Sequence, residues 1–365
     1  MNKIANTFNT SKRFVSIFNL FFGLFSALVF AQVQEPTKEL PEIKLLKNEF
    51  IFDEAPFMQC HAPTIVALKN GSLMASWFAG THERHPDVAI YTSTLTNNSW
   101  SAPRKIATGM ENDSIHYPTW NPVLFENDQG VLFNYYKVGP SPSTWWGMYK
   151  TSTDNGQHWS LPKKLPSPIL GPIKNKPVQF NGHTIVSPSS VELEDGAIWK
   201  AHVEISNDNG YTWKHIEIPS KKDVKVIQPT IIQLPNNSLK ALLRSNKNVI
   251  MESVSTDFGE SWSMAKAGTV KNPNSGIDAV TLKNGGFLLV YNPTLSGKHW
   301  SEGRQTLNLA YSDDGVNWKD VLQLENEEEG EFSYPAIIQD SNDFVHIVYT
   351  YNRERIKYLK LKVKN

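Results

Sequence analysis

Cysteine, net charge and long apolar runs are all scarce in this sequence. Cys60 is the single cysteine among 365 residues, which excludes an internal disulfide and a cysteine-based metal cluster. Lys and Arg number 36 against 36 Asp and Glu, so no basic excess points to nucleic acid as a partner. Beyond the N-terminal region, no stretch is apolar enough to span a bilayer. With 40% hydrophobic residues, the chain can still bury a large core.

The N-terminus has the pattern of an export signal. Lys12 and Arg13 precede an apolar run over residues 14–30, which ends in a small-residue cleavage pattern. The alternative is an uncleaved membrane anchor, but the run is short and contains Asn19. We therefore expect residues 1–31 to be a signal peptide.

The expected signal peptide sets the domain boundaries and the location. Residues 32–45 are polar and contain prolines, which favours a short leader. The remaining chain, 46–365, is then one domain. We expect the mature protein to be periplasmic or secreted, with no membrane span after cleavage.

One motif, S-x-D-x-G-x-x-W, recurs along the domain. The Asp carboxylate closes a tight turn through backbone N–H groups, Gly supplies a positive φ, and Trp is a large apolar plug. The motif therefore predicts a hairpin that carries its own wedge. Full copies occupy 152–159, 206–213 and 255–262, a shorter copy occupies 312–318, and 93–100 keeps only the ends.

A second repeated line describes a short apolar strand that runs into an Asn/Gly/Asp turn and usually starts at a proline. Its copies start at Pro63, Pro122, Pro177, Pro229, Ile277 and Pro335. Each is followed by a second and a third strand, with a period of roughly 50 residues. Six such units predict an all-β, six-bladed β-propeller of four-stranded antiparallel blades. A β-sandwich does not need six matching units, and a β-helix has shorter coils. Residues 50–53 are expected to supply the missing strand of the sixth unit.

Side chains at the start of each first strand face the central channel of a propeller, and loops at one end of a scaffold commonly carry function. The strand starts hold His61, Asn121, Lys176, Gln228 and Tyr334 among others. The loops after the second strands that we expect at the site are 80–87 (with Glu83, Arg84 and Asp87), 137–146, 244–246 and 296–304.

The Asp turns and the six-unit layout resemble the sialidase (neuraminidase) superfamily, in its BNR-repeat, Asp-box branch, over roughly residues 45–362. Members hold a substrate carboxylate with three arginines, whose planar forks donate paired hydrogen bonds. Arg244 and Arg304 match two of them. The third belongs to an Arg-Ile-Pro sequence, and here that place reads His61-Ala62-Pro63.

The resemblance also implies the catalytic groups. Tyr334 matches the family's tyrosine nucleophile, a noted exception to two-carboxylate glycosidase chemistry. The family activates that tyrosine with a glutamate, and here the position holds Gln228, whose amide can orient the phenol but cannot take its proton. Asp87 fits the family's general acid best, with Glu83 as the competitor.

Other stiff, Pro- and Gly-rich loops present cations and flat aromatic faces, which suits an anionic sugar. Lys137, Lys174 and Lys176 would supply charge, and Trp145 or Trp146 a stacking surface. The alternative for these residues is turn chemistry and wedging between blades. The histidines lack ligand spacing with matching carboxylates, so neither a metal nor another cofactor is expected.

Three hypotheses for function remain. The first is an exported sialidase-like glycoside hydrolase that removes a terminal, acidic sugar. Arg244 and Arg304, with His61 and Lys176, would hold its carboxylate or sulfate. The second is a polysaccharide lyase that uses His61 as base and Tyr334 as acid on a uronate. The third is a glycan-binding propeller without catalysis. The sequence leaves the sugar, the linkage, the stereochemical outcome and the oligomeric state open.

Overall fold

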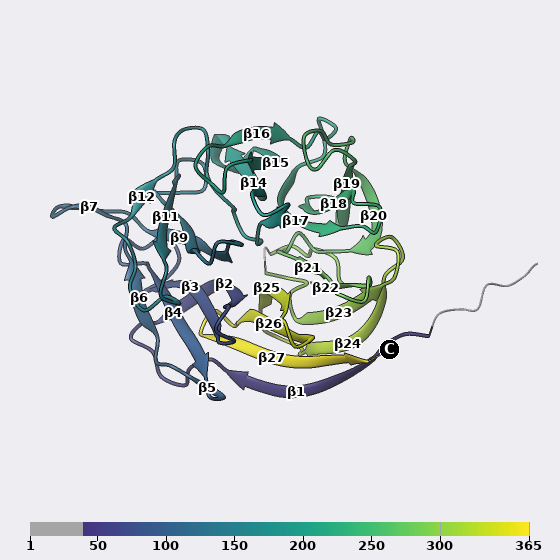
Figure 1. Cartoon of the computed structure of the whole chain (residues 1–365), viewed down its shortest axis with the longest axis horizontal. Helices are drawn as coiled ribbons and strands as arrows, with labels where there is room; N and C mark the ends of the chain where they lie inside the picture. The colour runs from purple at the N-terminus through teal and green to yellow at the C-terminus, as the bar shows by residue number, and fades with distance from the viewer. Residues whose placement is uncertain (1–38, 300, 365) are drawn as a thin grey trace, which may run out of the picture. The chain divides into compact units, whose positions relative to one another are not determined.

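Strands make up almost all regular structure in the described part of the chain. The computed structural model describes residues 39–299 and 301–364; the predicted signal peptide lies outside them. The single helical element within them is a 3-10 turn, η1 (Glu194–Gly196). None of the described residues form a helix long and apolar enough to cross a membrane. The strands form the six-bladed propeller that the repeats predict (Figure 1).

The first three blades follow one another along the chain. Blade 1 consists of β2 (Gln59–Ala67), β3 (Leu73–Gly80), β4 (Ala89–Thr96), β5 (Ser99–Trp100) and β6 (Arg104–Ala107). A small outer hairpin follows, formed by β7 (Met110–Asn112) and β8 (Ile115–His116). Blade 2 consists of β9 (Thr119–Glu126), β10 (Leu132–Val138), β11 (Trp146–Ser152) and β12 (Lys163–Lys164). Blade 3 consists of β13 (Val178–Phe180), β14 (Thr184–Leu193), β15 (Ile198–Ser206) and β16 (Lys214–Glu217).

The last three blades complete the ring. Blade 4 consists of β17 (Val226–Gln233), β18 (Leu239–Ser245), β19 (Val249–Ser255) and β20 (Lys266–Lys271). Blade 5 consists of β21 (Asp278–Thr281), β22 (Phe287–Tyr291), β23 (Thr306–Ser312) and β24 (Lys319–Asn326). Blade 6 consists of β25 (Phe332–Gln339), β26 (Phe344–Tyr351), β27 (Arg355–Lys364) and β1 (Glu42–Phe50).

The ring closes by pairing the two ends of the domain. β1 lies antiparallel to β27, with Glu42 opposite Lys364 and Phe50 opposite Lys357 (Figure 1). A strand from upstream of unit one therefore completes blade 6, as expected. It ends at Phe50, where the predicted strand begins, and it starts inside the segment predicted as a leader. The difference arises because β1 must match the ten-residue length of β27, which the sequence of β1 alone does not reveal.

The Asp turns have the expected construction. In the copy after β19, Ser255 Oγ donates to Asp257 Oδ1 at 2.8 Å, and the Ser261 N–H donates to the same oxygen at 2.9 Å. Gly259 adopts a φ of 96°, and Trp262 Nε1 donates to the Gly259 carbonyl at 3.0 Å. The buried indole of Trp262 belongs to an apolar cluster shared by blades 3 and 4. Burying a side chain of this size contributes about 2–3 kcal/mol, so each turn also fastens one blade to the next.

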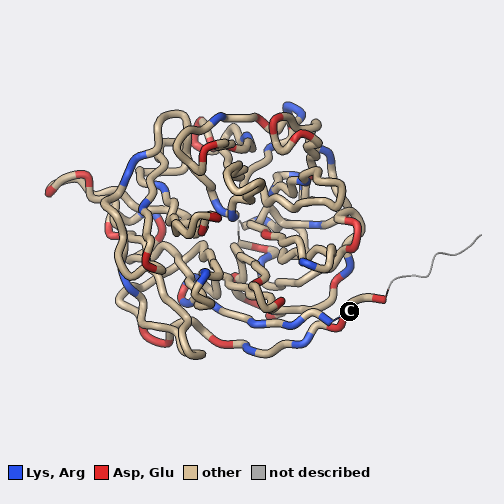
Figure 2. The backbone as a smooth tube through the Cα atoms, in the orientation of Figure 1, with Lys and Arg blue, Asp and Glu red and all other residues tan. Residues whose placement is uncertain are grey.

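The apolar core lies between the blades and leaves the polar groups to the edges. Leu288 and Val290 of blade 5, for example, pack in one cluster with Ile337 and Ile347 of blade 6. Figure 2 shows basic and acidic residues interspersed around the outer strands. Because strands alternate in direction, the starts of the first strands and the ends of the second strands share one edge, opposite to the Asp turns.

Candidate functional site

A pocket of about 430 Å³ opens at the edge where the first strands start and the second strands end. Its walls come from blades 1, 4, 5 and 6. The lining residues are His61, Glu83, Arg84, Arg244, Arg304, Tyr334 and Arg353. Six of the seven are residues that the sequence analysis selects; Arg353 is the addition.

A repeated backbone irregularity aims side chains at this edge. Ala62, Asn121, Gln228 and Tyr334 each precede a proline, and each has a positive φ, between 33° and 53°. The strand register shifts at each of these positions, as a β-bulge requires. A left-handed conformation at a residue other than glycine costs about 1–3 kcal/mol and tends to occur at functional sites. The prolines that mark the sequence repeat therefore mark bulges that turn side chains towards the channel.

Tyr334 is held by two donors. Arg244 Nη1 donates to the phenol oxygen at 2.9 Å and to Gln228 Oε1 at 3.1 Å. A guanidinium only donates, so the carbonyl oxygen of the Gln228 amide must face Arg244. The amide nitrogen then faces the phenol, and Gln228 Nε2 donates to it at 3.4 Å. Because the phenol oxygen accepts both bonds, the proton of Tyr334 is left to point into the pocket.

Arg244 is a buried cation with no acidic partner among residues 39–299 and 301–364. Its exposed fraction is 8%, and its Nε donates to Asn274 Oδ1 at 2.8 Å. The guanidinium also stacks on Trp199 at 5.6 Å from the ring centroid. Burying a charge without a counter-ion is costly, so this group is arranged for an anion.

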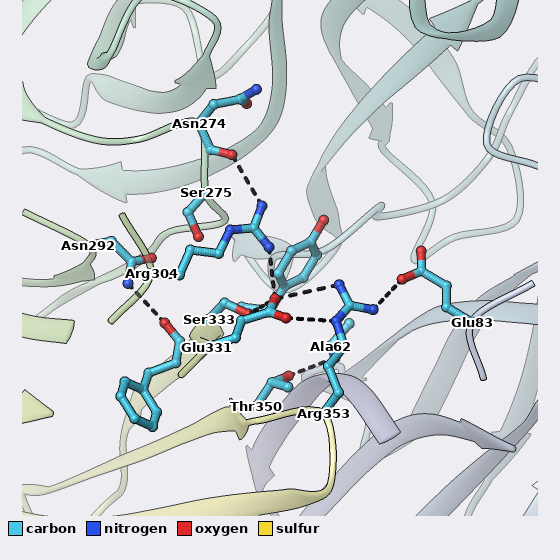
Figure 3. A network of polar contacts seen from close by, with 12 residues as sticks. Ala62, Glu83, Asn274, Ser275, Asn292, Arg304, Glu331, Ser333, Thr350 and Arg353 are labelled. Carbon is cyan, nitrogen blue, oxygen red and sulfur yellow. Dashed lines mark hydrogen bonds and ion pairs between the residues drawn. The ribbon is translucent and has the colours of Figure 1, made fainter. Parts of the chain in front are cut away.

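One buried carboxylate orients the other two central arginines. Arg304 Nη1 donates to Glu331 Oε1 at 2.8 Å, and Arg353 Nε donates to Glu331 Oε2 at 2.8 Å. Arg353 also forms an ion pair with Glu83, across from Glu331 (Figure 3). Two flanking arginines hold the pKa of Glu331 below its ordinary value despite burial, which acts in the opposite direction. Glu331 is therefore ionised and fixes both guanidinium planes.

His61 lies against Tyr334. The two ring centroids are 4.3 Å apart, and His61 is 4% exposed. Burial lowers its pKa well below the ordinary value, and Arg353, Arg304, Arg244 and Lys174 lower it further. The imidazole is therefore neutral at physiological pH, in the place where the resembling family carries an arginine.

Other predicted site residues are engaged elsewhere. Asp87 does not line the pocket; its carboxylate accepts bonds from Thr81 N at 3.0 Å and Thr81 Oγ1 at 2.6 Å, and pairs with His85 at 2.8 Å. These bonds hold its pKa below the ordinary value, although desolvation opposes them. Glu83 does line the pocket but is paired with Arg353.

The three lysines expected to contact substrate donate to protein groups instead. The ammonium of Lys137 donates to the Pro172 carbonyl. That of Lys176 contacts both oxygens of buried Asp278, at 3.0 and 2.9 Å.

Lys174 fills the channel beneath the pocket. Its ammonium donates to Asn175 Oδ1 at 2.9 Å, to the Ile277 carbonyl at 2.8 Å and to the Pro335 carbonyl. Burial lowers its pKa to about 7. A Cβ on Gly276 would lie 3.3 Å from Lys174 Cε and 3.4 Å from the Tyr334 ring, so both side chains lie beside this glycine.

Asn121 and Trp145 also lie away from the pocket lining. Asn121 is buried at the bulge of β9. Trp145 packs edge-on against Trp120, with ring centroids 5.8 Å apart. Trp145 therefore packs within blade 2, against the first strand of its own blade. Within the described residues, no three His, Cys, Asp or Glu side chains are grouped to hold a metal ion.

Arg353 and Trp199 escaped the sequence analysis, and both lie at short turns. Arg353 lies in the turn between β26 and β27, and Trp199 lies at the start of β15, after η1. Both turns follow second strands, as the four selected loops do. The sequence repeat could have identified them, because the turn after the second strand of every unit lies at the same edge of the propeller. The two turns lack the Pro, Gly and Trp clusters that draw attention to the longer loops.

Comparison with known proteins gives the following similarities. Residues 71–347 match the family described as BNR repeat-like domain. An anhydrosialidase of Macrobdella decora is 30% identical over 126 residues, which cover 31% of this chain and 16% of that protein. The match therefore spans only a small part of that relative's length.

Two solved structures share the fold at low identity. A protein of unknown function from Dyadobacter fermentans superposes with a TM-score of 0.72 at 15% identity, covering 89% of this chain and all of that one. A sialidase of Streptococcus pneumoniae gives a TM-score of 0.67 at 15% identity, covering 86% of this chain and 70% of that one. The family match covers well over half of the sequence. The chain belongs to the BNR repeat-like domain family, within the sialidase superfamily.

Proposed function

We propose that this protein is an exported sialidase-like glycoside hydrolase that removes a terminal acidic sugar from a glycan. The observation that carries the proposal is the buried, acid-free guanidinium of Arg244, set beside Tyr334 in a pocket with two further central arginines. Four guanidinium groups line the pocket against the one carboxylate of Glu83. Such a lining favours a carboxylate-bearing ligand and disfavours a neutral sugar.

Arg353 takes the place of the arginine that the family carries near His61. It reaches the pocket from blade 6, whereas the family arginine would come from blade 1. Three central guanidinium groups, those of Arg244, Arg304 and Arg353, then hold the substrate carboxylate. Hydrogen bonds between charged groups contribute about 1.5–3 kcal/mol each, so two or three of them account for strong selection of acidic sugars.

Tyr334 then acts at the anomeric carbon, as nucleophile or as stabiliser of an oxocarbenium-like state. The donors Arg244 and Gln228 stabilise negative charge that develops on its oxygen. They act where the family has a glutamate base. The reaction also needs a carboxyl group that protonates the leaving oxygen.

The test is a paired assay of the purified protein. We expect release of fluorophore from an α-sialoside or an α-uronide, and none from the neutral galactoside with the same leaving group. Tyr334→Phe should lower kcat at least ~100-fold, and Arg244→Ala should raise KM at least ~10-fold. Tyr211→Phe is the matched control, because it makes the same change at an 84%-exposed tyrosine in an Asp turn. Turnover that survives Tyr334→Phe would contradict the proposal.

A second candidate is a lyase, favoured by the contact between neutral His61 and Tyr334. His61 would take the proton beside a uronate carboxylate, and Tyr334 would protonate the leaving oxygen. Such a reaction gives an unsaturated product that absorbs in the ultraviolet, whereas hydrolysis does not. Binding of acidic glycans without either product would support the third hypothesis, a glycan-binding propeller without catalysis.

A further inference from the structure

Three carboxyl groups around the pocket are already bound by cations or hydrogen-bond donors of the protein. Glu331 lies between two arginines, Glu83 is paired with Arg353, and Asp87 accepts bonds from Thr81. A general acid must be protonated before it can donate. Each of these three carboxyl groups is already engaged by such partners, so we look for the proton donor elsewhere around the pocket.

The hairpin of blade 3 brings a fourth carboxyl group to the same edge. β14 and β15 are joined by η1, and Glu192 on β14 lies directly opposite Trp199 on β15. Side chains of directly opposed residues share one face of an antiparallel pair. Trp199 uses that face to contact Arg244, so Glu192 lies on the face of the hairpin that is turned towards this lining residue of the pocket.

The hairpin is fixed in this position by blade 4. Lys225 Nζ donates to the Gly196 carbonyl at 3.3 Å and lies 6.0 Å from the Trp199 ring centroid. Ser190 Oγ, further down β14, accepts a bond from the Gln228 N–H at 3.2 Å. The hairpin that carries Glu192 is therefore tied to the strand that carries Gln228, one of the two donors to Tyr334.

The surroundings of Glu192 favour its protonated form. Burial raises its pKa, Arg244 opposes this, Glu83 raises the pKa further, and Arg84 opposes. These groups come from β18 and from the loop between β3 and β4, the other elements that face it. Glu83 forms an ion pair with Arg353, whereas Glu192 is in no ion pair among the described residues.

We propose that Glu192 is the proton donor to the leaving oxygen. The inference rests on the proposed hydrolase function and assigns its acid. The bond between the anomeric carbon and the leaving oxygen breaks, its electron pair goes to that oxygen, and the Glu192 proton follows. Tyr334 keeps its phenol proton, and its oxygen stabilises the positive charge that develops at the anomeric carbon. Water then attacks that carbon and returns a proton to Glu192, so one water is consumed.

The test compares substrates that differ only in their leaving group. A natural acidic disaccharide has an alcohol leaving group that needs a proton, whereas an activated aryl glycoside of the same sugar does not. In Glu192→Gln we expect kcat/KM to fall at least ~100-fold on the disaccharide and by less than ~5-fold on the aryl glycoside. The alkaline limb of the disaccharide pH profile should disappear, and Glu192→Asp should recover part of the rate.

Glu194→Gln is the matched control, because Glu194 is exposed on the same hairpin. Asp87→Asn tests the competing acid. An equal loss on both substrates in Glu192→Gln, or a loss restricted to the disaccharide in Asp87→Asn, would overturn the assignment while leaving the hydrolase intact. A wild-type protein that cleaves neither substrate would overturn both the hydrolase and its acid.

Discussion

Replacing Gln228 with glutamate would restore the carboxylate that the family places beside its tyrosine. Gln228 is 2% exposed, with Oε1 3.1 Å from Arg244 Nη1 and Nε2 3.4 Å from the Tyr334 phenol oxygen. In Gln228→Glu, one carboxylate oxygen keeps the bond to Arg244. The other faces the phenol and can accept its proton.

The structure sets the size of the effect on stability. A unit charge pair at 3.1 Å gains about 5 kcal/mol at an effective dielectric constant of 20. Desolvating a buried carboxylate costs several kcal/mol, which offsets most of that gain. We therefore expect the free energy of unfolding to change by less than about 2 kcal/mol, so the variant should fold.

Gln228→Glu should raise both kcat and KM, for different reasons. A positioned base contributes about 10²–10⁴-fold, so kcat for an acidic glycoside should rise if Tyr334 is the nucleophile. The new carboxylate also neutralises Arg244, so KM should rise as well. Lyase turnover, which needs the tyrosine as an acid, should instead fall.

Steady-state kinetics on an aryl α-sialoside and an α-uronide measure both constants. Gln233→Glu is the matched control, because it makes the same change at the far end of β17. An unchanged or lower kcat, with Tyr334 still required, would refute the reasoning, because it would show that proton removal from the phenol does not limit the reaction.

Three further variants test the arginine pair on Glu331, an Asp turn and the buried Lys174. Arg353→Lys keeps the charge but loses the paired geometry to Glu331, so KM for an acidic glycoside should rise ~10-fold with kcat nearly unchanged, measured by the same assay. Asp257→Asn weakens three hydrogen bonds in an Asp turn, and should lower the melting temperature by about 2 °C at pH 7. Since those bonds lower the pKa of Asp257, this contribution exists above the unfolded pKa and is lost as pH falls through the folded one, so the two melting curves should converge in acid. Lys174→Met leaves three buried hydrogen-bond acceptors without their donor, so it should reduce the free energy of unfolding by about 3 kcal/mol in urea titrations. A change below about 1 kcal/mol would mean that the buried Lys174 does not stabilise the fold.

Repetition made the fold predictable. The Asp turns and proline-started strands mark each unit several times, so an error in one unit does not change the architecture. The bounds of β1 were less accessible, because a closing strand takes its length from the partner across the ring. That partner lies at the other end of the sequence, and no local pattern states where pairing with it begins.

The candidate site was predictable where a bulge or a strand end fixes a side chain. Tyr334, Gln228 and His61 follow from the prolines, and Arg244 and Arg304 from the ends and starts of strands. The lysines show the limit of such reasoning. A cation near a channel can face ligand or protein, and the buried carbonyl groups that receive these ammonium groups are visible only in three dimensions. Arg353 and Glu192 lie at or beside turns too short to stand out by composition.

His61 stands where the resembling family has an arginine, and Arg353 brings a guanidinium group to the pocket from another blade. These two differences are linked. Arg353, Arg304 and Arg244 all act on His61 electrostatically, and each lowers its pKa. An arginine at position 61 would therefore add a fourth guanidinium to the central three, of which only Arg304 and Arg353 contact the buried carboxylate of Glu331. A neutral imidazole avoids that repulsion and still packs on Tyr334. The number of central guanidinium groups stays at three, while one of them approaches from blade 6. In the proposed hydrolase, the substrate carboxylate would therefore be held from a different side of the pocket than in the resembling family.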